Sequence, residues 1–292
     1  MSNGYYPALG TPLDRDGSVL TGSLIKHVED QIGRKAEGLL VMGSMGMQPM
    51  IKDSEYAKVA QIAAEAARGQ CPVYAGVMDN SVARVKDRIE RLQGIKLEGV
   101  VTTVPFYFQS TQTEIIAFYR AIADTSPYPL YLYDLPGVTQ CKIQAATVIE
   151  LMRHPNIRGI KSGDLALVRG LSRSLRDVNP EFEVIYSGLD TFDVAYSYGI
   201  TRTLDGMFSC TSQIAERMYE ALQAGNLESA AGHLDSIVGL RNLFAEVGVF
   251  PGFTHAMNLL GFEGDFHPDY SSRLNPQQAD KVESYMRQIR LI

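Results

Sequence analysis

Residues 99–133 read GVVTTVPFYFQSTQTEIIAFYRAIADTSPYPLYLY, and this stretch contains one full unit of the pattern that organises the chain. An apolar, β-branched run (99–104) is followed by a polar turn, a segment with helical periodicity (112–123) and the next apolar run (130–133). Each apolar run is hydrophobic nearly throughout and does not alternate, which is typical of a strand buried on both faces of a parallel sheet. The unit therefore predicts a strand, a helix and a second, parallel strand.

The same unit recurs along most of the sequence, with strands beginning about every 20 to 35 residues, the length of one βα unit. The predicted strands are residues 5–9, 38–42, 73–77, 99–104, 130–133, 157–161, 182–187 and 203–208. The predicted intervening helices are residues 23–35, 54–68, 82–92, 112–123, 143–152 and 165–175. Such a succession of units predicts an α/β fold, a (β/α)8 TIM barrel. An open doubly wound sheet is the alternative, although its glycine fingerprint for a dinucleotide is missing.

The pattern changes after residue 209, where strand-like runs stop. Residues 213–224, 227–244 and 276–289 have helical periodicity, and no Pro- or Ser-rich linker separates them from the preceding units. We therefore expect a barrel over residues 1–210. A C-terminal helical extension over residues 211–292 would pack on it, and the two would form one structural unit.

Composition excludes several classes of protein. The 292 residues are 45% hydrophobic, so the chain can bury enough surface to fold. A net charge of -6 argues against a nucleic-acid-binding surface. No apolar run is long enough to span a membrane, and the N-terminus lacks the pattern of a signal peptide. Three cysteines without metal-like spacing indicate reduced thiols in a cytoplasmic protein: Cys71, Cys141 and Cys210.

Lys161 is the most informative single residue, because it closes an apolar strand. In a barrel the chemistry belongs at the carboxyl ends of the strands and in the loops that follow them. A buried ammonium is costly to desolvate, so burial favours the neutral amine, which is the nucleophile of Schiff-base catalysis. The alternative for Lys161 is a side chain that extends along the barrel mouth to water.

Other candidate groups stand at the ends of neighbouring strands. Tyr133 closes the preceding strand, and its phenol suits proton transfer; the alternative is an ordinary core tyrosine. The loop 43–46 reads GSMG, and its amides with the Ser44 hydroxyl suit a carboxylate. Tyr107 follows Pro105 at another strand end, where it is either functional or a rim aromatic. The five histidines fall in predicted helices or loops, which argues against a metal-dependent hydrolase and for no metal.

Together these motifs resemble the pyruvate-dependent class I aldolase family of dihydrodipicolinate synthase and N-acetylneuraminate lyase. The resemblance covers nearly the whole chain, and the motifs follow the family's order. They are ALGTPL (8–13), GSMG (43–46), AGV (75–77) with Asn80, PFY (105–107), LYDLPG (132–137), GIK (159–161), SG (187–188) and GMFS (206–209). Each motif alone is weak, whereas the ordered set is specific.

The resemblance implies a mechanism. Lys161 would form a Schiff base with the keto carbon of pyruvate or another 2-oxo acid, and Tyr133 would shuttle protons. Ser44 would relay protons and, with the Met45 amide, hold the substrate carboxylate. Three further positions would contact substrate: Val138, Gly188 and Phe208. No metal or organic cofactor is expected, because the imine itself acts as the electron sink.

The resemblance also implies an assembly. In the synthase branch a tyrosine matching Tyr107 is lent by a neighbouring subunit and completes a hydroxyl relay with Ser44 and Tyr133. We therefore expect a homo-oligomer, typically a tetramer built as a dimer of dimers. Its partners would be a small 2-oxo acid and an aldehyde, with no nucleic acid and no membrane.

Departures from the family pattern concern the second substrate. Val138 stands where the synthase has a carboxylate-binding arginine, and Met45 replaces a threonine. Valine cannot replace a guanidinium fork, so the second substrate would meet a more apolar pocket, which suits an apolar or aromatic aldehyde. True synthase activity with aspartate semialdehyde, a 2-oxo sugar acid aldolase or dehydratase, and a non-catalytic 2-oxo acid sensor are the alternatives. Arg84 replaces an acidic residue, so we do not expect lysine feedback.

Overall fold

Eight parallel strands form one sheet at the centre of the protein. The computed structural model describes residues 1–292, apart from the side chain of Arg176. The sheet order is β1-β8-β7-β6-β5-β4-β3-β2, so each strand pairs with its neighbour in sequence and β1 pairs with β8. The strands are β1 (Gly4–Pro7), β2 (Leu39–Val41), β3 (Val73–Gly76), β4 (Gly99–Thr103), β5 (Leu130–Asp134), β6 (Ile157–Ser162), β7 (Glu183–Tyr186) and β8 (Arg202–Asp205). All eight predicted strands are thereby confirmed to within a few residues at their ends.

The gap between β1 and β2 is bridged just beyond the regular pairing, which nearly closes the barrel. Ala8 and Leu40 form an isolated parallel bridge. The Leu9 N–H donates to the Leu40 carbonyl at 2.8 Å, and the Glu37 N–H donates to the Tyr5 carbonyl at 3.1 Å. The predicted barrel is confirmed, and the open doubly wound sheet is excluded.

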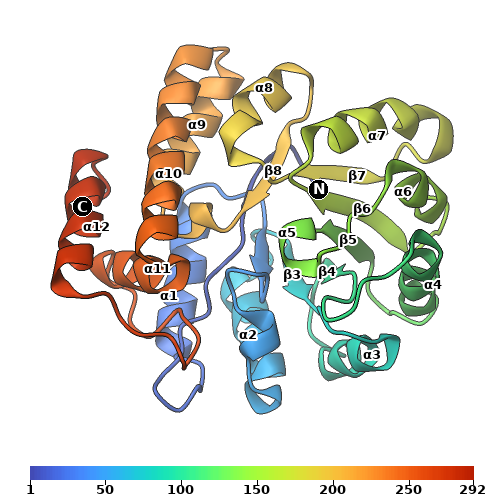
Figure 1. The fold of residues 1–292 in the computed structure, drawn as a ribbon, viewed down its shortest axis with the longest axis horizontal. Helices are drawn as coiled ribbons and strands as arrows, with labels where there is room; N and C mark the ends of the chain where they lie inside the picture. The colour runs from blue at the N-terminus through green and yellow to red at the C-terminus, as the bar shows by residue number, and fades with distance from the viewer.

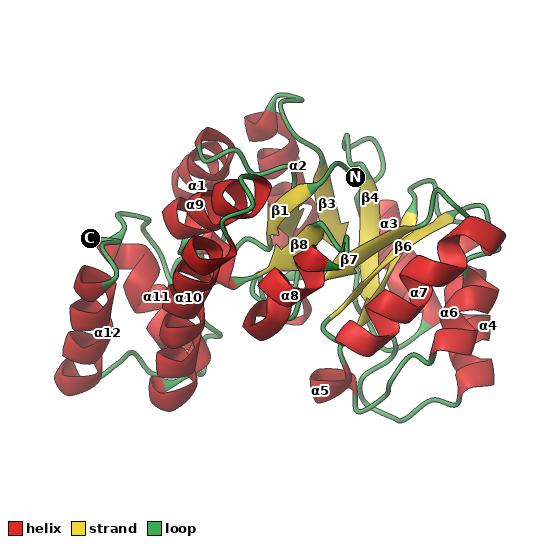
Figure 2. Ribbon diagram, turned by 90° about the horizontal axis from the view of Figure 1, so that it is seen from above, coloured by secondary structure: helices red, strands yellow, loops and turns green.

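Helices surround the barrel and extend it on one side (Figure 1). Between the strands lie α1 (Thr21–Gly33), η1 (Gln48–Met50), α2 (Asp53–Ala67), α3 (Val82–Arg91), α4 (Gln112–Ala123), α5 (Pro136–Thr139), α6 (Ala145–Leu151), α7 (Leu165–Val178), η2 (Leu189–Thr191) and α8 (Phe192–Ser197). After β8 come η3 (Met207–Ser209), α9 (Ser212–Gln223), α10 (Leu227–Val247), α11 (Val249–Leu259) and α12 (Pro276–Gln288). Figure 2 shows α10, α11 and α12 on the opposite side of the strands from α4 and α6.

The structure differs from the predicted secondary structure at the end of one strand and in three helices. The predicted strand 203–208 ends at Asp205, because its carboxylate accepts the Met207 N–H at 2.8 Å and the chain turns into η3. The helices α5, α8 and α11 are absent from the prediction. α5 and α8 are short, and α11 contains Pro251 and Gly252 near its start, which hide its helical pattern. The division at residue 210 stays a prediction.

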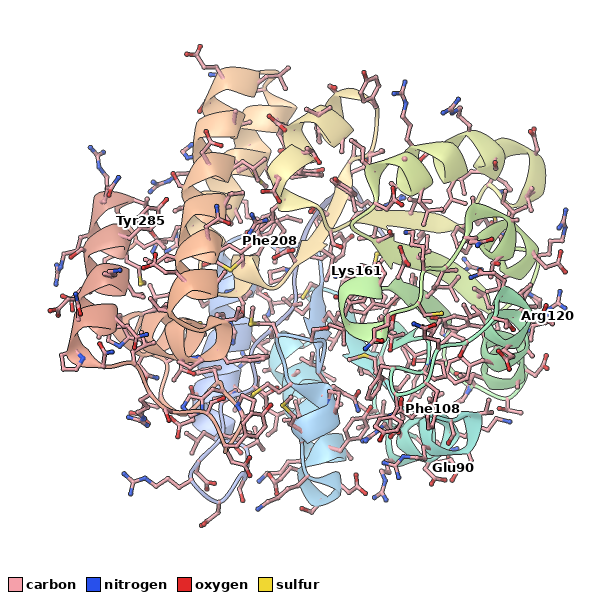
Figure 3. The ribbon with its side chains drawn as sticks, in the orientation of Figure 1. Glu90, Phe108, Arg120, Lys161, Phe208 and Tyr285 are labelled. Carbon is pink, nitrogen blue, oxygen red and sulfur yellow. The ribbon has the colours of Figure 1, made fainter. Side chains whose placement is uncertain are left out.

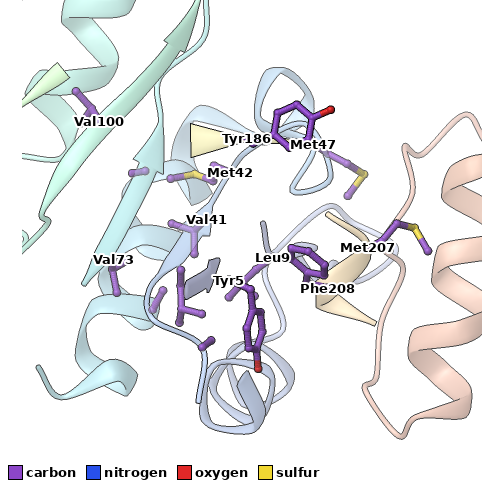
Figure 4. Close-up of a cluster of buried hydrophobic side chains, with 14 of the residues drawn as sticks. Tyr5, Leu9, Val41, Met42, Met47, Val73, Val100, Tyr186, Met207 and Phe208 are labelled. Carbon is purple, nitrogen blue, oxygen red and sulfur yellow. The ribbon is translucent and has the colours of Figure 1, made fainter. Parts of the chain in front are cut away.

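Successive side chains of each strand point to opposite faces of the sheet, so the strands separate two hydrophobic cores. On β5, Leu130 and Leu132 face the surrounding helices, whereas Tyr131 and Tyr133 face the barrel interior. The interior cluster consists of Tyr6, Ala8, Leu40, Tyr74, Val101, Tyr131, Tyr133, Ile185 and Leu204. Figure 4 shows part of the outer core, where Tyr5, Leu9 and Phe208 pack together. The interior is thus a packed core, and an open site is possible only at its ends.

His27 joins α1 to the turn after β8 in a fully buried position. Its Nε2 lies 3.0 Å from the Ser209 hydroxyl oxygen, and its ring centroid lies 5.0 Å from that of Phe262. Desolvation lowers the pKa of His27 to about 4, although its hydrogen bonds oppose this shift. The folded protein therefore keeps His27 neutral at pH values where the unfolded chain protonates it.

We expect this histidine to make stability depend on pH. The contribution of neutral His27 to the unfolding free energy is complete above pH 6.5, the pKa of histidine in the unfolded chain. That contribution is lost as the pH falls toward the pKa of His27 in the folded protein. Between pH 6.5 and pH 4 the loss amounts to about 3 kcal/mol of unfolding free energy. Urea denaturation of the wild type and of His27→Gln across this range measures the difference. Parallel pH curves for the two proteins would contradict this assignment.

No helix among the residues described is both long enough and apolar enough to cross a membrane.

Candidate active site

A cavity of about 370 Å³ opens at the carboxyl end of the barrel. Four of the residues predicted from the sequence line it: Ser44, Met45, Tyr133 and Lys161. They come from the loop after β2 and from the ends of β5 and β6, which lie far apart in the sequence. The parallel sheet brings these ends to one side of the molecule, as a barrel requires. Figure 3 shows Lys161 near the centre of the molecule.

The position of Lys161 follows from the alternation of β6. Ile160 packs in the outer core, so Gly159 and Lys161 face inward. A Cβ at Gly159 would lie 2.8 Å from the Tyr131 ring, so glycine here makes room for that ring inside the barrel. Lys161 lies two residues after Gly159 on the same face of β6, where the barrel interior opens into the cavity, and its side chain lines that cavity.

Lys161 and Tyr133 are direct neighbours. They are paired in the register of β5 and β6, and the Lys161 Nζ lies 3.9 Å from the centroid of the Tyr133 ring. The two residues are only 6% and 5% exposed. An amine held against a phenol in a nearly dry site has the arrangement that imine chemistry needs, with a proton-transfer group beside the nucleophile.

A buried carboxylate fixes the ends of both strands. Asp134 accepts hydrogen bonds from the Ser162 hydroxyl at 2.7 Å and from the Ile143 N–H at 3.1 Å. It also pairs with Lys142. Because Asp134 and Ser162 directly follow Tyr133 and Lys161, this contact restrains the relative positions of the phenol and the amine. The sequence pattern around Asp134 does not indicate this role.

The loop after β2 is held in one conformation. The Thr11 hydroxyl donates to the Gly46 carbonyl at 2.8 Å. A Cβ at Gly46 would lie 2.8 Å from the backbone oxygen of Leu9 and from the backbone nitrogen of Met42, so only glycine fits there. The Met47 N–H donates to the Ser44 carbonyl at 3.1 Å. Within the described chain, the N–H groups of Ser44 and Met45 donate no intramolecular bond, which leaves them available to an anionic ligand.

The other predicted site residues lie outside the cavity lining. Tyr107 is 77% exposed and stacks edge-on with Phe108 in the loop after β4. Val138 is 57% exposed on α5. Gly188 directly precedes η2, and the Tyr186 hydroxyl lies against it. Phe208 is fully buried against Tyr5 in the outer core. Their roles in binding or catalysis stay predictions.

Two charged residues that the sequence analysis missed line the cavity. Asp205 ends β8, and Arg241 lies on α10. Burial raises the pKa of Asp205, while the positive charges of Lys161 and Arg241 act in the opposite direction. Apolar side chains complete this wall: Met207, Phe244, Ala245 and Val249. The expected apolar pocket for the second substrate stays a prediction.

Metal ligation has no support in the site geometry. Among the described residues, no three His, Cys, Asp or Glu side chains gather closely enough to hold a metal ion.

Comparison with known proteins agrees with this geometry. The model of the dihydrodipicolinate synthetase family matches residues 1–285. The chain belongs to the dihydrodipicolinate synthetase family. Two similar relatives are each named 4-hydroxy-tetrahydrodipicolinate synthase. The one from Acidiphilium cryptum is 30% identical over 91% of both chains. The one from an Exiguobacterium species is 31% identical over 90% of this chain and 89% of its own.

Solved structures of the dihydrodipicolinate synthetase family share the fold. A prophage protein of the family from E. coli K12, crystallised with pyruvate, superposes with a TM-score of 0.91 at 20% identity over 100% of both chains. The Thermotoga maritima dihydrodipicolinate synthase gives the same three values. A synthase variant described as monomeric gives a TM-score of 0.90 at 20% identity, covering 99% of this chain and 97% of its own.

Proposed function

We propose that this family member is a class I aldolase or related lyase whose Lys161 forms a Schiff base with pyruvate or another small 2-oxo acid. The observation that carries the proposal is the burial of the Lys161 amine against the Tyr133 ring, inside the cavity that the loop after β2 also lines. The family and the names of the relatives support the same chemistry.

The proposed reaction uses the groups that face the cavity. The Lys161 amine attacks the keto carbon, and loss of water gives an iminium. This cation draws electrons from the neighbouring carbon, so loss of a proton there gives an enamine. The enamine carbon then attacks an aldehyde, and hydrolysis returns the free lysine; cleavage is the reverse. Tyr133 moves the protons, and no metal or organic cofactor takes part because the imine is the electron sink.

The loop after β2 supplies the proposed carboxylate site. The free N–H groups of Ser44 and Met45 point to an anion-binding turn, and the Ser44 hydroxyl adds a third donor. Donors fixed in this way orient the 2-oxo acid so that its keto carbon faces Lys161. Ser44 is also the proposed relay between Tyr133 and solvent.

A single experiment separates the proposed enzyme from a 2-oxo acid sensor. In deuterated buffer, enamine formation exchanges the methyl hydrogens of pyruvate for deuterium without any second substrate. Proton NMR follows the loss of the methyl signal, and we expect loss that depends on enzyme concentration. Binding of pyruvate without exchange would contradict the proposal and favour the sensor.

We further propose a homo-oligomer, a tetramer built as a dimer of dimers. The support is the pair Tyr107 and Phe108, which project from the protein at the loop after β4 and are available to a second copy. The Asn80 side chain accepts the N–H groups of Phe106 and Tyr107 at 2.8 and 3.0 Å, so this loop is preformed. Sedimentation velocity tests the proposed oligomer, and a monomeric species would contradict it. A monomer is a real alternative, because one of the similar structures is described as a monomeric variant.

We also propose that the enzyme is cytoplasmic. The thiols of Cys71, Cys141 and Cys210 are all free, which suits a reducing compartment.

A further inference from the structure

A carboxylate and a hydroxyl lie directly behind the reactive pair, on the outer face of the sheet. Leu132 and Ile160 pack in the outer core, so Asp134 and Ser162, two residues further along β5 and β6, face the same way. Neither of them belongs to the described lining of the cavity. Any effect of Asp134 on the reaction must therefore act through the positions of its neighbours in the two strands.

The buried carboxylate joins the end of β5 to the end of β6. Its Oδ1 accepts the Ile143 N–H at 3.1 Å, and its Oδ2 accepts the Ser162 hydroxyl at 2.7 Å. The Lys142 Nζ donates to the same Oδ2. The Ser162 oxygen in turn accepts the Asp164 N–H at 3.1 Å, so the serine is held from both sides.

Lys142 supplies the positive charge that this carboxylate needs. Within the described chain it is the one basic side chain with a nitrogen within 4.0 Å of the Asp134 carboxylate. Its Nζ also lies 3.1 Å from Asp164, which caps α7 by accepting the Leu167 N–H at 3.0 Å. Lys142 itself lies on the surface, in the loop between α5 and α6. Asp134 is cut off from water, so its charge would be costly without this partner.

Loss of the Lys142 charge should disturb the reactive pair. A buried carboxylate without its cation takes up a proton or turns toward another donor, and either change alters its bond to Ser162. The strand register pairs Tyr133 with Lys161 one residue before this contact, so a shift here changes the separation of the phenol and the amine. A displacement of about 1 Å between reacting groups can lower a rate by about 100-fold.

We propose that Lys142 is a positioning residue: it neutralises Asp134, keeps Asp134 bonded to Ser162 and so holds the Lys161 amine against the Tyr133 ring. Lys142 does not contact the substrate, because it lies outside the cavity lining. The inference rests on the proposed function, since it takes Lys161 as the nucleophile. It makes the reaction depend on the charge of a surface lysine.

The test measures exchange of the pyruvate methyl hydrogens in deuterated buffer at a series of pyruvate concentrations. In Lys142→Met we expect kcat for exchange to fall by about tenfold or more, because the reacting groups are misplaced. The KM for pyruvate should stay within about twofold of the wild type, because the proposed carboxylate site is the loop after β2. Lys142→Arg should lose far less activity, since it restores a positive charge beside Asp134. Equal losses in the two variants would contradict the inference.

A double variant shows whether Lys142 acts through Asp134. Asp134→Asn combined with Lys142→Met removes the buried charge together with its partner. The asparagine can still accept the Ile143 N–H and donate to the Ser162 hydroxyl, which accepts as well as donates. We expect the double variant to recover most of the kcat that Lys142→Met loses, because residues that act through one contact have non-additive effects. A double variant no faster than Lys142→Met overturns the inference.

Ser162→Ala tests the same link without changing any charge. It removes the bond between the strand ends and leaves Lys142 paired with Asp134. We expect kcat for exchange to fall by about threefold or more with little change in the KM for pyruvate. This variant decides the matter if circular dichroism shows that Lys142→Met does not fold. An unchanged kcat in Ser162→Ala overturns the inference.

Lys281→Met is the matched control. Lys281 also pairs with a carboxylate, but the side chain of its partner Glu246 is 59% exposed, whereas that of Asp134 is 1% exposed. The same substitution here leaves no buried charge behind, so we expect the wild-type kcat. Equal losses in Lys281→Met and Lys142→Met would mean that removing any surface charge is enough, which contradicts the inference.

Borohydride trapping with pyruvate keeps the two proposals apart. If the wild type traps no pyruvate, the proposed function itself fails. If the wild type traps pyruvate and Lys142→Met exchanges the methyl hydrogens with the wild-type kcat, the inference about Lys142 fails and the proposed function stands.

Discussion

Replacing Lys161 with methionine lowers kcat/KM by about 10,000-fold or more in our account, because the nucleophile is lost and no other group can form the imine. Methionine has a similar length and suits the buried position, where Lys161 is 6% exposed. The fold should therefore persist, and circular dichroism can verify this. Turnover is measured with pyruvate and an aldehyde, and exchange of the pyruvate methyl hydrogens gives a second readout.

Lys161→Arg is the sharper variant. It keeps the positive charge beside the Tyr133 ring, but a guanidinium stays protonated in proteins and does not act as the amine nucleophile. We expect activity as low as in Lys161→Met. The control is Lys35→Arg, an exposed lysine that pairs with Glu216 and Glu220, and it should behave as wild type. Substantial activity in Lys161→Arg would mean that the positive charge matters and not the imine.

Tyr133→Phe should lower kcat by about 100- to 1,000-fold, the usual contribution of a positioned proton-transfer group. Phenylalanine keeps the ring that packs against Lys161, so the amine stays in place and only the hydroxyl is lost. Imine formation should slow. The KM for pyruvate should change little, because the pyruvate carboxylate is proposed to bind the loop after β2 and not Tyr133. Stopped-flow trapping and steady-state kinetics measure the two effects separately.

Tyr131→Phe is the matched control for this variant. Tyr131 lies on the same strand and the same face, but at the opposite end of the barrel, where its hydroxyl donates to Glu183 at 2.7 Å. Losing that bond should cost about 1 kcal/mol of stability and leave kcat unchanged. If both phenylalanine variants lose the same fraction of kcat, the hydroxyl of Tyr133 has no specific catalytic role.

Local sequence patterns predicted the barrel well, because its parallel strands are short apolar runs in regular succession. The same regularity placed Lys161 at a strand end, where barrel chemistry is expected, but only the family resemblance assigned it a catalytic role, which stays a prediction. Prediction was weaker where the chain departs from the pattern. Residues 206–208 look like a strand continuation, yet the Asp205 carboxylate turns the chain there. In α11, Pro251 and Gly252 obscure a helix that tertiary packing stabilises.

The site was only partly predictable, for a physical reason. Ser44 and Met45 follow a strand, Tyr133 and Lys161 lie near the ends of two others, and in a barrel these carboxyl ends meet on one side. Arg241 lies on a helix 80 residues beyond Lys161, and nothing in its local sequence distinguishes it from a surface arginine. Its place in the cavity depends on how α10 packs across the barrel mouth, and only the three-dimensional structure contains that information.

The most direct test of the account is chemical trapping of the imine. The purified protein is incubated with pyruvate and borohydride and digested, and its peptides are analysed by mass spectrometry. We predict a reduced pyruvate adduct on the peptide that contains Lys161 and on no other lysine, with no adduct when borohydride is omitted. An unmodified Lys161 peptide under conditions where the protein turns over pyruvate would contradict it.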